Sequence, residues 1–253
     1  MASSSSIEWT EATWNPVTGC TKIGPGCSHC YAERMARRLQ AMGNPRYAHG
    51  FQVTLHNDLV DLPLRWRQPR AIFVNSMSDL FHEAVPLPFI RAVFSTMQAA
   101  HWHVFQILTK RAERLVELAP SLPWPANVWM GVTVERQDCA WRVDYLRRVP
   151  AAVRFLSCEP LLGPLLLELA GIDWVIVGGE SGPHARPMDL AWARSLRSQC
   201  RAHGVPFFLK QLGGPVDKRG KDRALLDGQL WRQMPQVASP LQVAEARPTY
   251  EPG

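Results

Sequence analysis

The sequence has no run of about 18 consecutive apolar residues, the length that a transmembrane helix requires. Its first residues, Met1 to Ser6, carry neither a basic region nor an apolar core, so they do not predict a signal peptide. We expect residues 1–8 to form a disordered leader. These absences favour a globular cytoplasmic protein, and the reducing cytoplasm would keep its six cysteines free to bind metal.

Several chemical motifs are also missing. The eight histidines are scattered, without the H-x3-H or H-E-x2-H spacing of zinc enzymes. Gly178-Gly179 lacks the Lys-Ser/Thr pair of a phosphate-binding loop. The C-x2-C pair occurs once, whereas a closed structural zinc site needs four ligands. Most histidines are therefore interpreted as structural.

The composition suits one domain. The chain has 253 residues, and 46% of them are hydrophobic, which is ordinary for a single α/β barrel of about 250 residues. Lysine and arginine number 28 against 22 aspartates and glutamates, a net charge of +6. This excess permits an anionic partner without requiring one.

Apolar runs alternate with amphipathic ones along most of the chain, and this alternation predicts a β/α barrel of the TIM type. The predicted strands are residues 13–19, 52–55, 71–75, 104–108, 128–134, 153–157, 174–178 and 206–209. The predicted helices are residues 31–42, 58–66, 88–100, 112–118, 136–148, 161–169 and 190–203.

The barrel is expected to span residues 9–212, with no linker or internal repeat to divide it. Residues 213–235 predict a basic hairpin, and residues 236–253 a loose polar tail. The basic side chains of the hairpin are Lys218, Arg219, Lys221 and Arg223.

Three cysteines lie within eleven residues, Cys20, Cys27 and Cys30, spaced C-x6-C-x2-C. Glycines and a proline between the first two allow the backbone to curl, and the helix predicted after Cys30 favours thiolates at its start. Three cysteines can hold an iron–sulfur cube and leave one iron open. An open iron beside bound S-adenosylmethionine is the starting point of one kind of radical chemistry.

Three closely spaced cysteines on the loop after the first strand of a β/α barrel resemble the radical S-adenosylmethionine superfamily. The usual spacing there is C-x3-C-x2-C. The wider spacing, with Trp14-Asn15-Pro16 before it and Tyr31-Ala32-Glu33 after it, is similar to a phage- and prophage-borne family of radical enzymes of largely unassigned function. The resemblance covers about residues 9–235.

The resemblance implies a [4Fe-4S] cluster on Cys20, Cys27 and Cys30 and a 5′-deoxyadenosyl radical that abstracts hydrogen from a substrate. It implies an electron donor such as a flavodoxin or a ferredoxin. Members of the superfamily often close only six β/α units, so the last two units here could be an extension. His29 stands where the superfamily has an aromatic side chain near adenine.

The predicted strands end in unusually polar residues, which suggests a large polar ligand above the barrel. The carboxylate of S-adenosylmethionine would pair with a cationic side chain, and its ammonium would donate to acceptor side chains. Glycines would let the protein backbone approach the ligand closely. The candidate cofactor residues are Lys110 or Arg111 for the carboxylate, Asn75, Ser76 and Asp79 for the ammonium, Glu135 for the ribose, and Thr133, Gly178 and Gly179 elsewhere on the rim.

Glu159 and Glu180 then remain for the substrate, and Lys210 is expected either to act with them or to pair with one of them. Cys158 falls at a strand end, where a thiol could donate a hydrogen atom. Cys139 and Cys200 fall within predicted helices, where a buried cysteine packs as a small apolar group.

The favoured substrate is a nucleic-acid base or modified nucleotide, because the chain is basic and the resembling family is phage-borne. Isomerisation of an amino-acid adduct on thymine and a radical lyase acting on damaged pyrimidines are two forms of such a reaction. Two other classes stay open: a radical enzyme that modifies a peptide or protein, and a non-catalytic zinc-binding module that binds nucleic acid.

Overall fold

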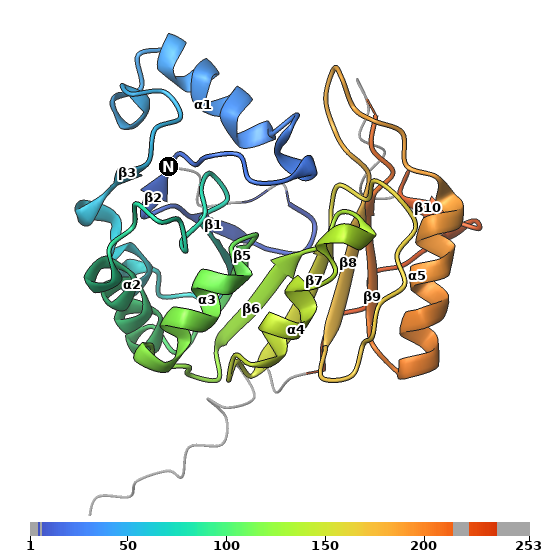
Figure 1. Cartoon of the computed structure of the whole chain (residues 1–253). Helices are drawn as coiled ribbons and strands as arrows, with labels where there is room; N and C mark the ends of the chain where they lie inside the picture. The colour runs from blue at the N-terminus through green and yellow to red at the C-terminus, as the bar shows by residue number, and fades with distance from the viewer. Residues whose placement is uncertain (1–4, 6, 215–222, 237–253) are drawn as a thin grey trace, which may run out of the picture.

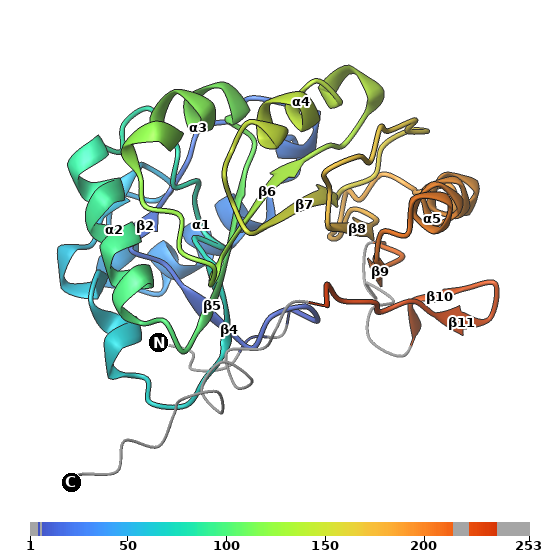
Figure 2. The same ribbon diagram turned by 90° about the horizontal axis from the view of Figure 1, so that it is seen from below.

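The structure, a computed structural model, describes residues 5, 7–214 and 223–236. Its centre is a parallel sheet in the order β1-β4-β5-β6-β7-β8-β9. The strands are β1 (Ala12–Trp14), β4 (Ala71–Val74), β5 (Val104–Thr109), β6 (Val128–Thr133), β7 (Val153–Cys158), β8 (Trp174–Gly178) and β9 (Phe207–Gln211). The sheet curls into a half-barrel (Figures 1 and 2). The predicted β/α barrel is therefore confirmed in its partial form.

Both faces of the sheet are buried, which explains the continuous apolar runs. One face carries a cluster of large aromatic side chains, among them Trp9, Phe73, Phe155 and Trp174. The other face packs against helices in the main core. Because side chains alternate along a strand, residues two apart share a face, so the residues at each strand end divide between these two environments.

The helices are α1 (Tyr31–Ala41), α2 (Leu87–Ala99), α3 (Ala112–Leu118), α4 (Arg142–Arg147) and α5 (Leu190–His203). Helices α2 to α5 pack on the outside of the sheet, and α1 stands above the carboxyl ends of the strands (Figure 1). Helix α5 has the predicted bounds. The Asp189 side chain caps its start by accepting a hydrogen bond from Ala191 N, and Gly204, at φ 68°, ends it.

Two predicted elements near the start of the chain are wrong. Residues 52–55 are not a barrel strand, because β3 (Thr54–Leu55) pairs antiparallel with β2 (Val17–Thr18) outside the main sheet. The helix predicted at 58–66 is two 3₁₀ turns, Asn57–Leu59 and Leu62–Arg65. Pro63 provides no amide hydrogen for a continuous helix there.

The short helix predicted at 161–169 is also wrong. The segment is extended and irregular, and its burial alternates: Leu165, Leu167 and Leu169 are buried, whereas Leu166 is exposed. This period of two is typical of an extended chain lying on a core, not of a helix.

The predicted C-terminal hairpin is present in part, as β10 (Leu225–Leu226) and β11 (Gln229–Leu230). The chain then runs antiparallel along β9, where Leu209 N donates to Trp231 O at 2.7 Å. Lys218, Arg219 and Lys221 lie outside the described residues, as do residues 1–4, 6 and 237–253 of the leader and tail. In the part of the chain that is described, no helix combines the length and apolar character needed to cross a membrane.

Candidate functional site

The three cysteines lie on a loop, residues 19–30, that crosses above the carboxyl ends of the strands. Gly19 begins the loop at φ 83°, and a Cβ there would overlap the Gln52 carbonyl, so glycine is required. A 3₁₀ turn, Pro25–Cys27, follows, and Cys30 is the N-cap of α1. The expected loop-to-helix junction is confirmed.

All three thiols are free and partly exposed. Burial raises the pKa of Cys20 to about 12, with Asp79 adding to the shift and Arg111 opposing it. This thiol is therefore protonated in the metal-free protein, and metal binding must displace its proton. Across residues 5, 7–214 and 223–236, no three Cys, His, Asp or Glu side chains stand together as a ready-made metal site. Cys20, Cys27 and Cys30 form no disulfide, so their three thiols are of the donor type that an iron–sulfur cluster requires.

The first anchor of the cysteine loop is at the end of β5. Arg111 Nη2 donates to Thr21 Oγ1 at 2.9 Å, and Thr21 Oγ1 also lies 2.9 Å from His82 Nε2. Asp79 is buried beside them and accepts hydrogen bonds from Thr109 Oγ1 at 2.7 Å and from Lys110 N at 3.2 Å. Asp79 and Arg111 thus hold the protein's own backbone and loop.

The second anchor is Glu135, which follows β6 and is fully buried. Its Oε2 accepts from Arg142 Nη1 at 2.7 Å, and its Oε1 lies 3.5 Å from Lys110 Nζ. Gly26 of the cysteine loop packs directly against this carboxylate: a Cβ on Gly26 would lie 2.7 Å from Glu135 Cγ. The carboxylate predicted to hold a ribose is therefore paired within the protein and supports the loop.

Replacing Gly26 with alanine is expected to push the loop away from Glu135, because the added methyl group has no space. We expect a cost of roughly 1–3 kcal/mol in unfolding free energy and weaker retention of iron after reconstitution. Urea denaturation and iron analysis would measure both. Gly163→Ala is the matched control, since nothing lies within 4 Å of its added Cβ. Equal behaviour of the two variants would contradict the packing argument.

The third anchor is Glu180, after β8. Arg186 donates to its Oε1 through Nη2 at 2.5 Å and to its Oε2 through Nε at 2.9 Å, and His29 Nδ1 lies 3.0 Å from the same Oε2. Arg186 Nη2 also donates to Pro25 O of the cysteine loop at 3.0 Å. Burial opposes ionisation of Glu180, but the bonds from Arg186 and His29 outweigh it and lower its pKa to about 2.

The low pKa of Glu180 predicts how stability depends on acid. A carboxylate with a folded pKa of about 2 and an ordinary value of 4.5 stabilises the fold above pH 4.5, and this contribution is lost as the pH falls towards 2. Glu180→Gln cannot ionise, so its unfolding temperature should fall less than that of the wild type across this window. Glu117→Gln, at an exposed position on α3, is the control and should keep the wild-type profile.

A fourth group of side chains lies towards β9. Lys210 Nζ and Glu159 Oε1 are 2.6 Å apart, which is the pairing considered from the sequence, and Gln211 Nε2 donates to the same oxygen at 3.1 Å. A Cβ on Gly178 would lie 3.2 Å from Glu159 Cδ, and one on Gly179 would overlap the Leu212 carbonyl. The chain's own packing therefore accounts for both glycines.

Cys158 does not face this site. It is fully buried in the main core on the helix side of the sheet, and burial raises the pKa of its thiol. A thiol in this position packs as a small apolar group and has no access to a ligand above the strands. Cys139 and Cys200 are also buried, as expected.

Several buried polar atoms at the strand ends lack hydrogen-bond partners, and buried polar groups are normally paired. They include Asn75 Nδ2 after β4, Thr133 Oγ1 at the end of β6 and Glu135 Oε1 beyond it. Asn75 adopts φ 60° and uses its Oδ1 to accept from Val17 N at 3.2 Å. Ser76 is held by Asn15 Oδ1 at 3.2 Å. Asn75, Thr133 and Glu135 are all residues predicted to bind the cofactor, whereas Arg142, whose Nε is also unpaired, is not.

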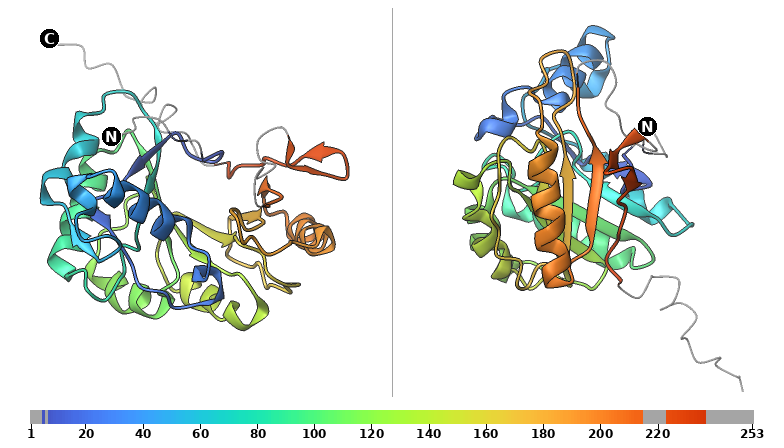
Figure 3. Two further views of the ribbon diagram at one scale, coloured as in Figure 1. Left: turned by 90° about the horizontal axis from the view of Figure 1, so that it is seen from above. Right: turned by 90° about the vertical axis from the view of Figure 1, so that its right-hand side faces the viewer.

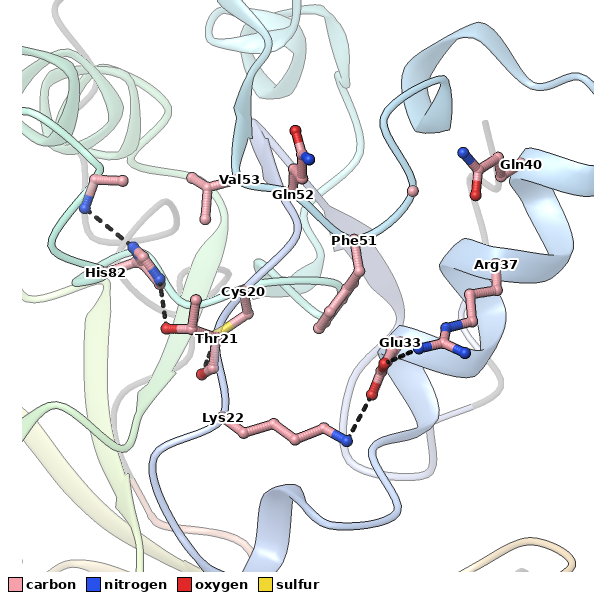
Figure 4. Close-up of a pocket in the computed structure, with 12 residues that line it drawn as sticks. Cys20, Thr21, Lys22, Glu33, Arg37, Gln40, Phe51, Gln52, Val53 and His82 are labelled. Atoms are coloured by element: carbon pink, nitrogen blue, oxygen red, sulfur yellow. Dashed lines mark hydrogen bonds and ion pairs between the residues drawn. The ribbon is translucent and has the colours of Figure 1, made fainter.

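An open pocket of about 650 Å³ lies on the outer side of the cysteine loop, between the loop and α1 (Figure 4). Cys20 contributes to its wall, and Lys22 crosses it to pair with Glu33 at 2.9 Å. Phe51 and His82 complete the wall near Cys20. One of the three thiols is therefore reachable from outside the barrel.

Sequence reasoning missed Arg142, Arg186 and His82. Arg142 lies seven residues after Glu135, on the next helix, and Arg186 lies six residues after Glu180. A carboxylate placed at a buried strand end needs a cation, so each arginine could have been sought within the following loop or helix. The residues that pair across the rim, such as His82 with Thr21, leave no such signal.

Comparison with known proteins gives a family for the chain. Residues 4–235 match the family model described as "Protein of unknown function (DUF5131)". The chain belongs to this family. The search of curated proteins gave no significant match.

Two solved structures have a related shape. One is a mutant of spore photoproduct lyase, with 11% identity and a TM-score of 0.46, covering 82% of this chain and 58% of that one. The other is spore photoproduct lyase complexed with dinucleoside spore photoproduct, with 10% identity and a TM-score of 0.40, covering 78% and 54%. The chain thus spans little more than half the length of these structures.

Proposed function

We propose that this protein is a radical S-adenosylmethionine enzyme. The observation that carries the proposal is the cysteine loop: three free thiols on a segment anchored at β5, β6 and β8 above the carboxyl ends of a parallel half-barrel. In β/α barrels, this edge is where reactive groups gather. A bound [4Fe-4S] cluster would supply an electron for reductive cleavage of S-adenosylmethionine to methionine and a 5′-deoxyadenosyl radical.

Cys20, Cys27 and Cys30 would hold the cluster. Asn75 Nδ2 and Thr133 Oγ1 are among the buried atoms without a hydrogen-bond partner, and both lie at strand ends, so they are the first candidates to contact the polar parts of the cofactor. The Lys110 ammonium could pair with the carboxylate of S-adenosylmethionine. It contacts Glu135 at 3.5 Å, and this single contact leaves other N–H groups of Lys110 able to donate. The loop residues His29 and Gly26 would orient the cysteines and do not themselves bind the metal.

For the substrate we propose a nucleic-acid base, altered either by isomerisation of an amino-acid adduct on thymine or by a lyase reaction on a pyrimidine. The net charge of +6 supports an anionic substrate. Glu159 and Lys210, paired at the strand ends, are the groups proposed to face it. The electron donor is proposed to be a small flavodoxin- or ferredoxin-like protein.

Anaerobic reconstitution with iron and sulfide tests the proposal. The expected product is a brown protein with about four irons per chain that, once reduced, converts S-adenosylmethionine to 5′-deoxyadenosine. Deuterated thymidine-containing oligonucleotides should transfer deuterium to the 5′-deoxyadenosine. A colourless protein that retains zinc and forms no 5′-deoxyadenosine would contradict the enzyme assignment. Cleavage without deuterium transfer would contradict only the substrate class.

A further inference from the structure

Helix α1 exposes one face that combines aromatic, apolar and basic side chains. Tyr31, Arg34, Met35, Arg38 and Met42 are spaced three, four, seven and eleven residues from the first, so they lie on one side of the helix. We call this set the α1 face. Its three large apolar members are 48%, 41% and 69% exposed, in chain order. The buried side of the helix carries only small residues.

The α1 face lies across the mouth of the half-barrel. At its start, the Tyr31 hydroxyl donates to Ser76 O, after β4. One turn later, Arg34 Nη2 donates to Ser181 O, after β8, at 2.9 Å, and a Cβ on Gly182 would overlap the Arg34 guanidinium. The view from above shows α1 over the carboxyl ends of the strands (Figure 3, left). The two contacts therefore fix this face beside the entrance to the site.

Tyr31 presents an aromatic ring whose position is fixed. Its backbone begins α1 directly after Cys30, and its hydroxyl is held by Ser76 O. A half-exposed ring held in this way can stack on a nucleobase at small entropic cost.

The charge of the α1 face is positive and uncompensated. Among the described residues, Arg38 is exposed and makes no hydrogen bond or ion pair that would neutralise it. The nearest carboxylate of the helix, Glu33, lies on another side and is paired with Lys22 and Arg37. An unpaired arginine on the same side of α1 as an exposed aromatic ring, about two helical turns away, suits single-stranded nucleic acid, which offers a phosphate and a base at each nucleotide.

We propose that the α1 face binds a single-stranded or locally opened polynucleotide, with Arg38 on a phosphate and Tyr31 stacked on the base next to the one that enters the mouth. This inference rests on the proposed function, and it adds the polymeric nature of the substrate and the surface that holds it.

The test measures binding of the reconstituted full chain to a fluorescent oligothymidine of about 12 nucleotides, within the length that single-strand grooves cover. Fluorescence anisotropy at three salt concentrations gives the affinity and its salt slope. Arg38→Gln should weaken binding and reduce the slope by about 0.7, the value for one phosphate contact on a single strand. Arg201→Gln, in the last turn of α5 and likewise exposed, is the matched control and should change neither.

The stacking contact has its own pair of variants. Tyr31→Leu should weaken binding roughly five- to hundredfold, since stacking of one base contributes about that much. Its salt slope should stay at the wild-type value because no charge is lost. Tyr31→Phe keeps the ring and removes the hydroxyl, so it should retain most of the affinity. Loss of binding in both variants would indicate that the hydroxyl contact, not stacking, is what matters, and would overturn the stacking role.

Equal affinities for Arg38→Gln and Arg201→Gln would overturn the proposed surface. If wild type binds no oligonucleotide but Arg38→Gln weakens binding of a reduced flavodoxin, the face receives an acidic protein and the proposal is wrong. Formation of 5′-deoxyadenosine by the wild type without substrate is measured in parallel. When that reaction occurs and oligonucleotide binding does not depend on α1, this inference fails while the proposed function stands.

Discussion

Replacing Cys20, Cys27 or Cys30 singly with alanine is expected to abolish formation of 5′-deoxyadenosine and to remove most of the iron after anaerobic reconstitution. Each thiolate would hold a different iron, so no remaining cysteine can substitute for the lost one. We expect a loss of more than about 100-fold, because even outer-shell changes at metal sites cost roughly 10–100-fold. Iron analysis and chromatography of the nucleoside product would measure it.

Cys139→Ala and Cys200→Ala are the controls for this experiment. Both cysteines are buried away from the loop, so their removal should lower stability slightly and leave iron content unchanged. A Cys20→Ala variant with full iron and full cleavage would show that the ligand set is wrong.

The second large effect concerns the buried ion pair under the cysteine loop. Arg142→Met should destabilise the protein by about 3 kcal/mol, the lower end of the cost of breaking a buried ion pair, because Glu135 would remain fully buried with only the Lys110 ammonium, 3.5 Å away, to balance its charge. That loss is a large part of the 5–15 kcal/mol that typically stabilises a domain. Urea denaturation of the metal-free protein would measure the change in unfolding free energy.

Two further variants separate pairing from packing. Arg142→Met combined with Glu135→Gln removes both charges, so it should cost clearly less than Arg142→Met alone. Arg65→Met breaks an exposed pair with Asp61 and should cost less than about 1 kcal/mol. If the double variant is as unstable as the single one, the loss comes from packing of the arginine and not from an unpaired carboxylate.

The regular part of the fold could be predicted because burial and periodicity are local properties of the sequence. Strand β8 is a continuous apolar run with glycine after it, and α5 has an aspartate cap and a terminal glycine. Residues 52–55 include the β-branched Val53 and Thr54, which favour a strand, but β3 pairs with β2 and not with the main sheet. Which strand pairs with which depends on contacts between distant segments, and these leave no local pattern.

The candidate site could be predicted as a region but not as a network. Most of the polar residues that follow the strands lie at one edge of the sheet, since parallel strands end at one edge, whereas Cys158 is in the core on the helix side. Their individual partners were not. Glu135 and Asp79 were expected to face a ligand, yet both are buried and hold the protein's own groups. A polar residue at a strand end can either bind a ligand or form hydrogen bonds within the protein. The positions of the neighbouring side chains decide which of these it does.

The open sheet gives the cysteine loop a mechanical role. Within the described residues no pairing joins β1 to β9, so hydrogen bonds around a closed ring do not determine how tightly the sheet curls. The cysteine loop connects two distant parts of the open sheet. Arg111, after β5, donates a hydrogen bond to Thr21, and Arg186, after β8, donates one to Pro25 O. The width of the entrance is therefore set by the same segment that carries the cysteines.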